Sequence, residues 1–365
     1  MSNQNEMISN VMRLTETRNI EDIQVKREVQ VNEVVVEPYL LSICHADLRY
    51  FTGERRKEAL EEKLPMALFH EGIGRIVFSK HPDFQEGDRV VVVPSIPGYL
   101  LKHTKKSLCC NNCKNGGPSN YCEKGVFLGS GYDGLAQDKL VIHGENVLKI
   151  PAEINDDIAL LSELISVSLY AINVAQLDSL EKEDKVAVFG DGPVGYLTST
   201  ALHYIYGISK EKLLVFGAEP NKIKQFKDFA TINLVHDFNF HNVTGVKRIF
   251  ECTGGKYSTN AINQAIDLVD RHGSIVLMGV TEELVPINTR DVLEKGIHLL
   301  GSSRSRVEDF EVLIESFKDE RYRKALYPLI PEKTHVVKSA KELEAVLDEA
   351  SQSLSWEKVY IHLEW

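Results

Sequence analysis

The sequence predicts an α/β protein in which a parallel sheet covered by helices is inserted into a β-rich domain. Three features of the chain lead to this fold class. Short apolar runs between turn residues fill the region from about Val11 to Val90, as in an antiparallel or barrel-like domain. From Val186 onward strand-like and helix-like segments alternate, which indicates a parallel sheet with both faces covered. After Arg306 helices and one last strand return, and these would complete the first domain.

The β-rich domain is expected to span residues 1–157 and to be completed by residues 306–365. Its segment from Leu108 to Cys122 is rich in Asn and Gly and too short to bury a core of its own. We therefore expect an irregular lobe there. The predicted strands of this domain are 33–38, 74–78, 87–93, a pair within 134–149 and 358–363, and its predicted helices are 307–318 and 341–350.

The inserted domain is expected to span residues 158–305 and to begin with one long apolar helix over 158–172. The segments that follow have the length and composition of buried strands separated by helices. The predicted strands are 186–189, 213–216, 246–251, 274–280 and 297–301, with helices such as 194–204 and 261–269 between them.

Three glycines follow the first strand of the inserted domain at the spacing GxGxxG. Gly190 would permit a tight turn, Gly192 would let a pyrophosphate approach the backbone, and Gly195 would let the next helix pack against the strand. Pro193 and Val194 would open that helix, since proline suits a first turn, and its amides would face the phosphates. A bare match also fits an ordinary glycine turn. The strand before it, the helix after it and a second strand complete a βαβ unit, which favours a dinucleotide site of the Rossmann type.

The overall composition excludes several classes of function. The 365 residues carry 42 basic and 53 acidic side chains, a net charge of −11, which argues against general binding to nucleic acid or to a membrane surface. No apolar run is long enough to cross a membrane, and the first residues lack the basic and apolar regions of a signal peptide. We therefore expect a cytoplasmic protein.

Candidate metal ligands form two groups. Four of the six cysteines lie within fourteen residues, and in a reducing compartment such a cluster predicts a metal before a disulfide. These four are Cys109, Cys110, Cys113 and Cys122. Elsewhere Cys44 and the pair His70-Glu71 offer a thiolate, an imidazole and a carboxylate, the ligands that Zn²⁺ prefers. Each of them alone also fits an incidental role, as a small core residue or a satisfied buried histidine.

Glu163 favours the metal interpretation. It lies in the apolar helical run 158–172, which contains no Lys, Arg or His, and an isolated buried carboxylate is costly unless it is paired or bound to a metal. A structural salt bridge is the alternative, and its cation would have to come from another part of the chain.

The order of these features resembles that of the zinc-dependent medium-chain dehydrogenases and reductases over nearly the whole length. It continues through the segments 251–254 and 273–279. Within that superfamily the chain is most similar to the ribulose-5-phosphate reductases, which make ribitol 5-phosphate for teichoic-acid and capsule precursors. The stretches that carry this narrower resemblance are 42–53, 64–72, 190–196, 288–296 and 301–305.

The resemblance implies a Rossmann doubly wound parallel sheet inserted into a GroES-like β-rich catalytic domain. It implies a catalytic zinc held by Cys44, His70, Glu71 and Glu163, with the two carboxylates sharing a place in turn with water. Zinc would polarise the ketone of D-ribulose 5-phosphate and stabilise the developing alkoxide, while NADPH would deliver the hydride. The expected product is D-ribitol 5-phosphate, for CDP-ribitol and polymer synthesis. A cytidylyltransferase partner and a homodimer or homotetramer are also implied, as are contacts of Thr253 and Gly279 with the cofactor.

The proton donor departs from the pattern of alcohol dehydrogenases. Where these enzymes have Ser or Thr two residues after the first cysteine, this chain has Ala46, so the usual hydroxyl relay is missing. Zinc-bound water, His45 and Tyr50 remain as candidates.

The cofactor site departs from NAD-binding members, which place an acidic residue at the end of the second strand to hold the adenosine ribose. Here that strand ends in Gly217. Without a carboxylate a 2′-phosphate is not repelled, and Lys222 or Lys224 could approach it, so NADP(H) is favoured over NAD(H). Glu219 is the counter-argument, because a shifted loop could bring its carboxylate to the ribose.

The cysteine lobe departs from the structural-zinc pattern Cx2Cx2Cx7C. Cys110, Cys113 and Cys122 give Cx2Cx8C, and Ser107 stands at the first position. Cys109 could serve as the fourth ligand, although adjacent cysteines chelate one ion awkwardly, and the alternative is a reduced lobe without metal.

For the sugar phosphate, Arg304 matches the arginine by which polyol dehydrogenases hold their substrate, and its guanidinium suits a phosphate or hydroxyls. Arg49 and Arg290 are lesser candidates, and a surface salt bridge is the alternative for each arginine. Three other functions stay open: an NAD-linked polyol or polyol-phosphate dehydrogenase of the sorbitol or galactitol-phosphate type, a non-catalytic nucleotide-binding relative, and a zinc-binding regulator centred on the cysteine lobe.

Overall fold

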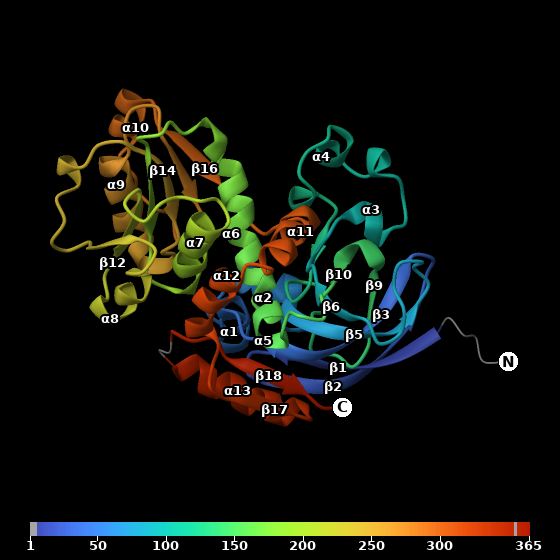
Figure 1. Ribbon diagram of the computed structural model, residues 1–365. Coiled ribbons are helices and arrows are strands. Elements are labelled where there is room, and N and C mark those ends of the chain that lie inside the picture. Colours follow the sequence, from blue (N-terminus) through green and yellow to red (C-terminus); the bar gives the residue numbers. More distant parts are fainter. Residues whose placement is uncertain (1–5, 354–355) are drawn as a thin grey trace. The chain divides into compact units, whose positions relative to one another are not determined.

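The computed structural model describes residues 6–353 and 356–365 (Figure 1). The chain forms two compact units. The first runs up to Glu163 and is completed by Ser305–Glu315 and Ile330–Trp365, and the second consists of Leu164–Arg304 and Ser316–Leu329. The second unit therefore interrupts the first in the sequence. The functional domain limits expected above, 1–157 with 306–365 and 158–305, stay predictions.

The first unit is built on strand β3, Glu33–Ser42, which lies in the middle of a seven-stranded sheet. The sheet follows the order β10-β6-β5-β3-β18-β17, and β9 also pairs with β3. All these pairings are antiparallel except that of β17 with β18. The bounds are β5 Glu71–Ser79, β6 Arg89–Val92, β9 Leu140–His143, β10 Val147–Lys149, β17 Thr334–Val337 and β18 Tyr360–Leu363.

Shorter elements complete this unit. Strands β1 and β2 form an antiparallel hairpin that β4 extends, and β7 pairs with β8. The strands are β1 Glu6–Glu16, β2 Asn19–Glu28, β4 Met66–Ala67, β7 Ser95–Ile96 and β8 Val126–Phe127. The helices are α1 His45–Thr52, α2 Lys57–Lys63, α3 Gly98–Leu101, α4 Asn111–Lys114, α5 Asp156–Leu160, α11 Val307–Ser316 and α13 Ala340–Gln352.

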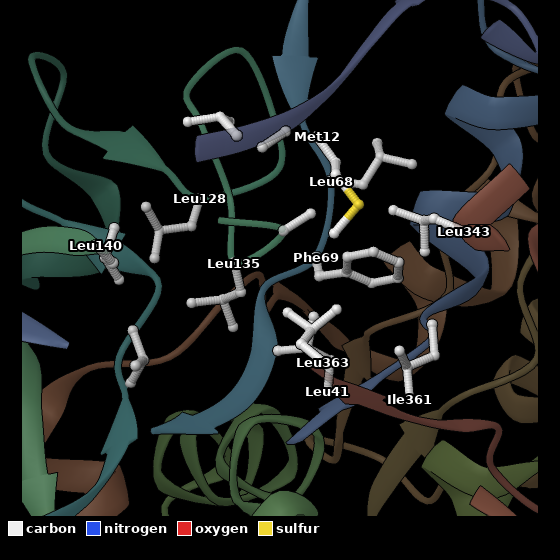
Figure 2. Close-up of a cluster of buried hydrophobic side chains, with 14 of the residues drawn as sticks. Met12, Leu41, Leu68, Phe69, Leu128, Leu135, Leu140, Leu343, Ile361 and Leu363 are labelled. Carbon is white, nitrogen blue, oxygen red and sulfur yellow. The ribbon is translucent and has the colours of Figure 1, made fainter. Parts of the chain in front are cut away.

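An apolar core fixes the segment that enters β5. Leu68 and Phe69 are almost completely buried, and Figure 2 shows them among side chains from β1, β3, α13 and β18. Burying side chains of this size stabilises a fold by about 1.5–3 kcal/mol each. The core therefore holds the backbone that immediately precedes His70.

The second unit contains a six-stranded parallel sheet of order β13-β12-β11-β14-β15-β16. This is the 3-2-1-4-5-6 order of a doubly wound nucleotide-binding fold, and the predicted fold class is confirmed. The strands are β11 Lys185–Phe189, β12 Leu213–Gly217, β13 Thr231–Leu234, β14 Val246–Glu251, β15 Ser274–Leu277 and β16 His298–Gly301. The helices are α6 Ser162–Ala175, α7 Pro193–Tyr204, α8 Pro220–Ile223, α9 Ser258–Leu268, α10 Thr289–Lys295 and α12 Glu320–Leu326.

Two predicted elements are corrected. The single helix over 158–172 is two helices, α5 and α6, because the amide of Leu161 bonds to the carbonyl of Ile158 in a tight turn. The predicted strand 274–280 ends at Leu277, because the amides of Met278 and Gly279 both bond to the carbonyl of Glu251. In both places a local hydrogen bond replaces the regular ladder. Among the described residues, no helix combines the length and apolar character that a membrane crossing needs.

Candidate active site

Cys44, His70 and Glu71 converge at the end of two paired strands. Ser42, the last residue of β3, is the register partner of Glu71, the first residue of β5. Cys44 follows two residues later as the N-cap of α1, and His70 directly precedes β5. One ligand atom from each of the three side chains lies within 4.8 Å of the others. The sheet register thus brings together residues that are 26 positions apart in the sequence.

Asp47, which sequence reasoning missed, ties these segments together. Its buried carboxylate accepts hydrogen bonds from the amides of Cys44 and Phe69, both at 3.0 Å. One of its oxygens lies 3.8 Å from Nδ1 of His70. An acid at the third position of a helix commonly reaches back to the cap, and that position was the available signal. Asp47 therefore orients two of the ligand-bearing segments.

Neighbouring groups shift the protonation of His70. Burial lowers the pKa of this imidazole, but the Asp47 carboxylate and the Cys44 sulfur oppose that effect and raise the pKa well above its ordinary range. A metal takes a neutral imidazole as ligand. A metal ion that binds here must therefore displace a proton.

Lys358 is the second residue that sequence reasoning missed. Its ammonium lies 3.1 and 2.9 Å from the two carboxylate oxygens of Glu71 and donates to the carbonyl of Ile43 at 2.8 Å. Burial raises the pKa of Glu71, but Lys358 outweighs this effect and the pKa is lowered. A lysine two residues before strand β18 was the signal in the sequence. The pair keeps Glu71 ionised beside the other two ligands.

Glu163 lies outside the group of ligand atoms that fall within 4.8 Å of one another. It is 5% exposed, in the first turn of α6. Burial raises the pKa of Glu163 to about 7, although His70 acts in the opposite direction. The residue is therefore close enough to His70 to interact with it electrostatically.

The donor set fits a catalytic zinc. A thiolate, an imidazole and a carboxylate supply three ligands of the types zinc prefers and leave a further position for water or substrate. The buried carboxylate of Glu71 and the raised pKa of His70 are also expected of a site whose negative charges a cation balances. Cys44, His70 and Glu71 would hold the ion, and Glu163 could replace Glu71 as a ligand.

The four cysteines of the lobe also form a cluster with the dimensions of a zinc site. Their sulfur atoms all lie within 4.8 Å of one another, and Cys122 is 3.6 Å from Cys109 and 3.8 Å from Cys110. Zn–S bonds of about 2.3 Å in a tetrahedron place sulfurs about 3.8 Å apart. The amides of Cys113 and Gly98 donate to two of the sulfurs. These amide bonds favour thiolates, and the one from Cys113 is the main reason that the pKa of Cys110 is lowered to about 7.

The glycine motif has the geometry expected of a phosphate-binding turn. Gly190 has a φ of 131°, and a Cβ on Gly195 would stand 2.0 Å from the Gly190 carbonyl. A Cβ on Gly192 would instead meet no atom within 4 Å, so the space in front of this backbone is open. Pro193 occupies the first turn of α7, and Val194 follows it.

The end of β12 explains why Gly217 is a glycine. A Cβ there would approach the Cβ of Asp191 at 2.7 Å. The Asp191 carboxylate accepts hydrogen bonds from the amides of Ala218 and Glu219, both at 2.8 Å. The carboxylate of Asp191 thus lies at the end of β12, where NAD-binding proteins have an acidic residue on the strand itself. Lys222 is half-buried in α8, and Lys224 follows exposed.

Glu251 organises two predicted cofactor contacts. Its fully buried carboxylate accepts hydrogen bonds from the amides of Thr253 at 2.8 Å and Gly279 at 3.2 Å. A Cβ on Gly279 would lie 2.7 Å from one of these oxygens. Glu251 therefore holds the two turns in one arrangement, a role that the sequence did not indicate.

The remaining candidates occupy different settings. Tyr50 is 2% exposed, and its hydroxyl contacts Ser130 and Lys63. Arg304 has a φ of 61° in the segment after β16. Arg290 pairs with Glu294 at 2.8 Å and is 82% exposed. This is the surface salt bridge that was the alternative to a phosphate contact. His45 is exposed at the start of α1 and Arg49 is half-buried in its last turn.

Comparisons with known proteins agree with this architecture. Residues 30–152 match the alcohol dehydrogenase GroES-like domain, and residues 222–319 match the zinc-binding dehydrogenase domain. The chain is 35% identical to ribulose-5-phosphate reductase 1 of Staphylococcus aureus over 365 residues, which cover 97% of this chain and 99% of that protein. It is 38% identical to the ribulose-5-phosphate reductase of Bacillus spizizenii over 304 residues, covering 83% and 84% of the two chains.

Solved structures show the same likeness. The crystal structure of S. aureus TarJ in complex with NADPH has a TM-score of 0.81 at 31% identity and covers 98% of this chain and 100% of that chain. L-Idonate 5-dehydrogenase from Escherichia coli, with a TM-score of 0.80 at 18% identity over 98% of this chain and 99% of that one, shares the fold. The predicted resemblance is confirmed, and the chain belongs to the ribulose-5-phosphate reductases of the zinc-binding alcohol dehydrogenase superfamily.

Proposed function

We propose that this chain is an NADPH-dependent, zinc-dependent oxidoreductase that reduces D-ribulose 5-phosphate to D-ribitol 5-phosphate. The observation that carries the proposal is the convergence of Cys44, His70 and Glu71 in a chain that matches named ribulose-5-phosphate reductases over nearly its full length. The product would serve teichoic-acid or capsule precursors through CDP-ribitol. Zinc supplies Lewis acidity toward the ketone when bound, and NADPH supplies the hydride.

The chain's own residues hold and tune this chemistry. Cys44 and His70 would be constant zinc ligands, and Asp47 fixes their segments through two amides. Lys358 neutralises part of the charge of Glu71, so the site carries less negative charge and a bound metal would be more electrophilic. Because Ala46 removes the hydroxyl relay and Tyr50 is committed to Ser130 and Lys63, zinc-bound water and His45 are the remaining proton sources.

The cofactor would bind at the glycine motif of the second unit. Gly190, Gly192, Pro193, Val194 and Gly195 would receive the pyrophosphate, and Thr253 and Gly279 would contact the cofactor farther along. Gly217 leaves no acid of its own at the strand end, and Lys222 is the cation proposed for the 2′-phosphate. The NADPH complex of TarJ, a relative at 31% identity, supports this preference.

Further parts of the proposal concern the setting of the enzyme. The first unit would be the catalytic domain, with functional limits 1–157 and 306–365, and residues 158–305 would bind the cofactor. We also propose a cytoplasmic homodimer or homotetramer whose product passes to a cytidylyltransferase. The four cysteines of the lobe would hold a structural zinc.

The test follows NADPH oxidation by absorbance with D-ribulose 5-phosphate and protein that has been loaded with zinc. Turnover that disappears after chelation and returns with zinc supports the proposal, and no turnover with zinc-loaded protein rejects it. Elemental analysis adds an independent count. Two zinc ions per chain support both sites, and one supports a single site. Protein without zinc would contradict the zinc-dependent mechanism.

An NAD-linked polyol-phosphate dehydrogenase is the second candidate, and the carboxylate of Asp191 favours it. This acid stands next to the end of β12, where a carboxylate holds an adenosine ribose in NAD-binding proteins. The ratio of kcat/KM for NADPH to that for NADH decides between the two. A ratio below one would assign the chain to the NAD-linked class.

A further inference from the structure

A lysine and two hydroxyl groups form a triangle in the first unit, apart from the zinc ligands. The ammonium of Lys63, at the end of α2, donates to the hydroxyl of Tyr50 at 3.1 Å and to that of Ser130 at 3.0 Å. These two hydroxyls lie 3.0 Å from each other. Within the part of the chain that the structure describes, Lys63 has no ion-pair partner. A half-buried lysine held by neutral hydroxyls keeps its positive charge uncompensated.

The triangle leaves hydrogen-bond donors for a further group. An ammonium has three donors, of which two are used here. Tyr50 and Ser130 each accept from Lys63, and only one hydroxyl proton is needed for the bond between them, so one hydroxyl proton also stays uncommitted. A second positive charge lies nearby, because the guanidinium of Arg55 is 4.6 Å from the centre of the Tyr50 ring. The ammonium of Lys63 lies 5.8 Å from the centre of the same ring, and two cations beside one tyrosine, together with a hydroxyl donor, suit a phosphate.

The triangle is linked by short segments to the zinc-ligand group of the same unit. Tyr50 lies on α1, whose N-cap is Cys44, and six helical residues advance by about 9 Å. Ser130 stands three residues after Phe127, whose ring centre lies 5.2 Å from that of His70. Three residues of extended chain span at most about 11 Å. Both segments therefore start at a zinc ligand or its neighbour and end at the triangle.

The reach of the proposed substrate is similar to the lengths of these two segments. In ribulose 5-phosphate the phosphorus follows the ketone carbon by five bonds, and single bonds of about 1.5 Å give a reach of at most about 7 Å. A phosphate oxygen and the third donor of Lys63 extend that reach on both sides. A ketone at the zinc ligands is therefore compatible with a phosphate at Lys63.

We propose that Lys63, the hydroxyls of Ser130 and Tyr50, and Arg55 form the subsite for the phosphate of the sugar phosphate. The inference rests on the proposed function, because it places the ketone at the zinc ligands. It makes Tyr50 a binding residue and not a proton donor. It also moves the phosphate contact from Arg304 to the first unit. The subsite explains how a dehydrogenase of this fold selects a phosphorylated ketose over a free one.

The test replaces the ammonium and keeps the length of the side chain. In Lys63→Met, the KM for D-ribulose 5-phosphate rises on the order of 10- to 100-fold while kcat changes little, because a charge-assisted hydrogen bond to substrate is lost. Lys63→Arg restores part of the affinity. The matched control is Lys57→Met on the same helix, a lysine that is 84% exposed and paired with Glu61, and its KM stays at the wild-type value.

Two further measurements keep the inference separate from folding and from the proposed function. Ser130→Ala removes one hydroxyl and raises KM by a smaller factor, so it tests the subsite even if Lys63→Met does not fold. Calorimetry with D-ribitol 5-phosphate and with ribitol measures binding without turnover, and the preference of the wild-type protein for the phosphorylated compound disappears in Lys63→Met. An unchanged preference, or one that Arg304→Met alone abolishes, overturns the subsite. If the wild-type protein does not reduce ribulose 5-phosphate, the proposed function falls, and the calorimetry still decides the subsite.

Discussion

The two candidate zinc clusters of the first unit differ in how their ligands are brought together. The cysteine cluster is local, with four identical ligand types inside one lobe and backbone amides that donate to the sulfurs. The cluster of Cys44, His70 and Glu71 is assembled from two strands, and charged side chains surround it. Four sulfurs occupy all four coordination positions of a tetrahedral zinc ion, whereas three mixed ligands leave one position open.

This difference separates a structural role from a reactive one. A closed set of thiolates offers substrate no access to its ion, so its contribution is to fold the lobe. At the mixed cluster, Asp47 and Lys358 set the orientation and the charge of the ligands, as partners of catalytic metals do. The same Cys→Ser substitution is therefore expected to abolish activity in the mixed cluster and to open the lobe in the cysteine cluster.

The largest expected effect is on activity in Cys44→Ser. Losing a zinc ligand removes several kcal/mol of transition-state stabilisation, so kcat/KM falls by about 10³-fold or more. When zinc has been removed from both proteins, the melting temperatures of the variant and of wild type stay close, because the core around Phe69 is untouched. NADPH oxidation and thermal melting measure the two quantities. A variant that retains more than about a tenth of the activity would contradict a catalytic role for this cluster.

The matched change in the other cluster is Cys122→Ser. Here we expect the zinc content to fall by one ion per chain and the lobe to open, because metal binding and local folding are coupled. Proteolysis within the lobe should become faster, while kcat measured on intact protein changes less than about threefold. Limited proteolysis with mass spectrometry locates the cut. A loss of activity equal to that of Cys44→Ser would end the division into structural and catalytic clusters.

Lys358→Met probes the charge that distinguishes the mixed cluster. Removing one partner of a buried ion pair costs about 3–5 kcal/mol, because the carboxylate of Glu71 is left without its cation in the metal-free protein. Zinc supplies a replacement positive charge, so zinc should raise the melting temperature of this variant more than that of wild type. Lys358→Arg is the control that keeps the charge. An equal zinc effect in all three proteins would show that Lys358 does not neutralise Glu71.

The sequence predicted the local features better than the distant ones. The cysteine lobe and the glycine turn were visible because their residues lie close together and their spacing has a direct geometric meaning. Strands β11, β12 and β15 were equally clear, since each is a short and mostly buried apolar run. Strand β13, with half-buried residues, lacked that signal and was not singled out.

The charged partners of the site could not be predicted in the same way. Lys358 meets Glu71 across 287 positions in the sequence, through the pairing of β18 with β3. That pairing places Tyr360 opposite Ser42 and so brings the end of the chain to the zinc ligands. The position of Asp191 was hidden for the same reason. Its carboxylate lies at the end of β12 because the glycine turn that carries it is next to the turn of Ala218 and Glu219. Pairings of this kind depend on register, which a one-residue shift changes completely.

The smallest expected effect of a substitution is a shift in the pH dependence of zinc affinity at the mixed cluster, measured in Cys122→Ser so that the lobe does not contribute. Without metal, the pKa of His70 is raised well above its ordinary range. Below that pKa the imidazole must lose a proton before it can bind, so the apparent affinity falls as the pH falls. From pH 8 to pH 6 the affinity should decrease by about tenfold per pH unit for each proton released. Competition with a chelator of known affinity gives the slope.

In Asp47→Asn the charge that raises the pKa of His70 is lost, so the pH dependence should begin at a lower pH. An identical profile in that variant would show that Asp47 orients His70 without tuning its protonation.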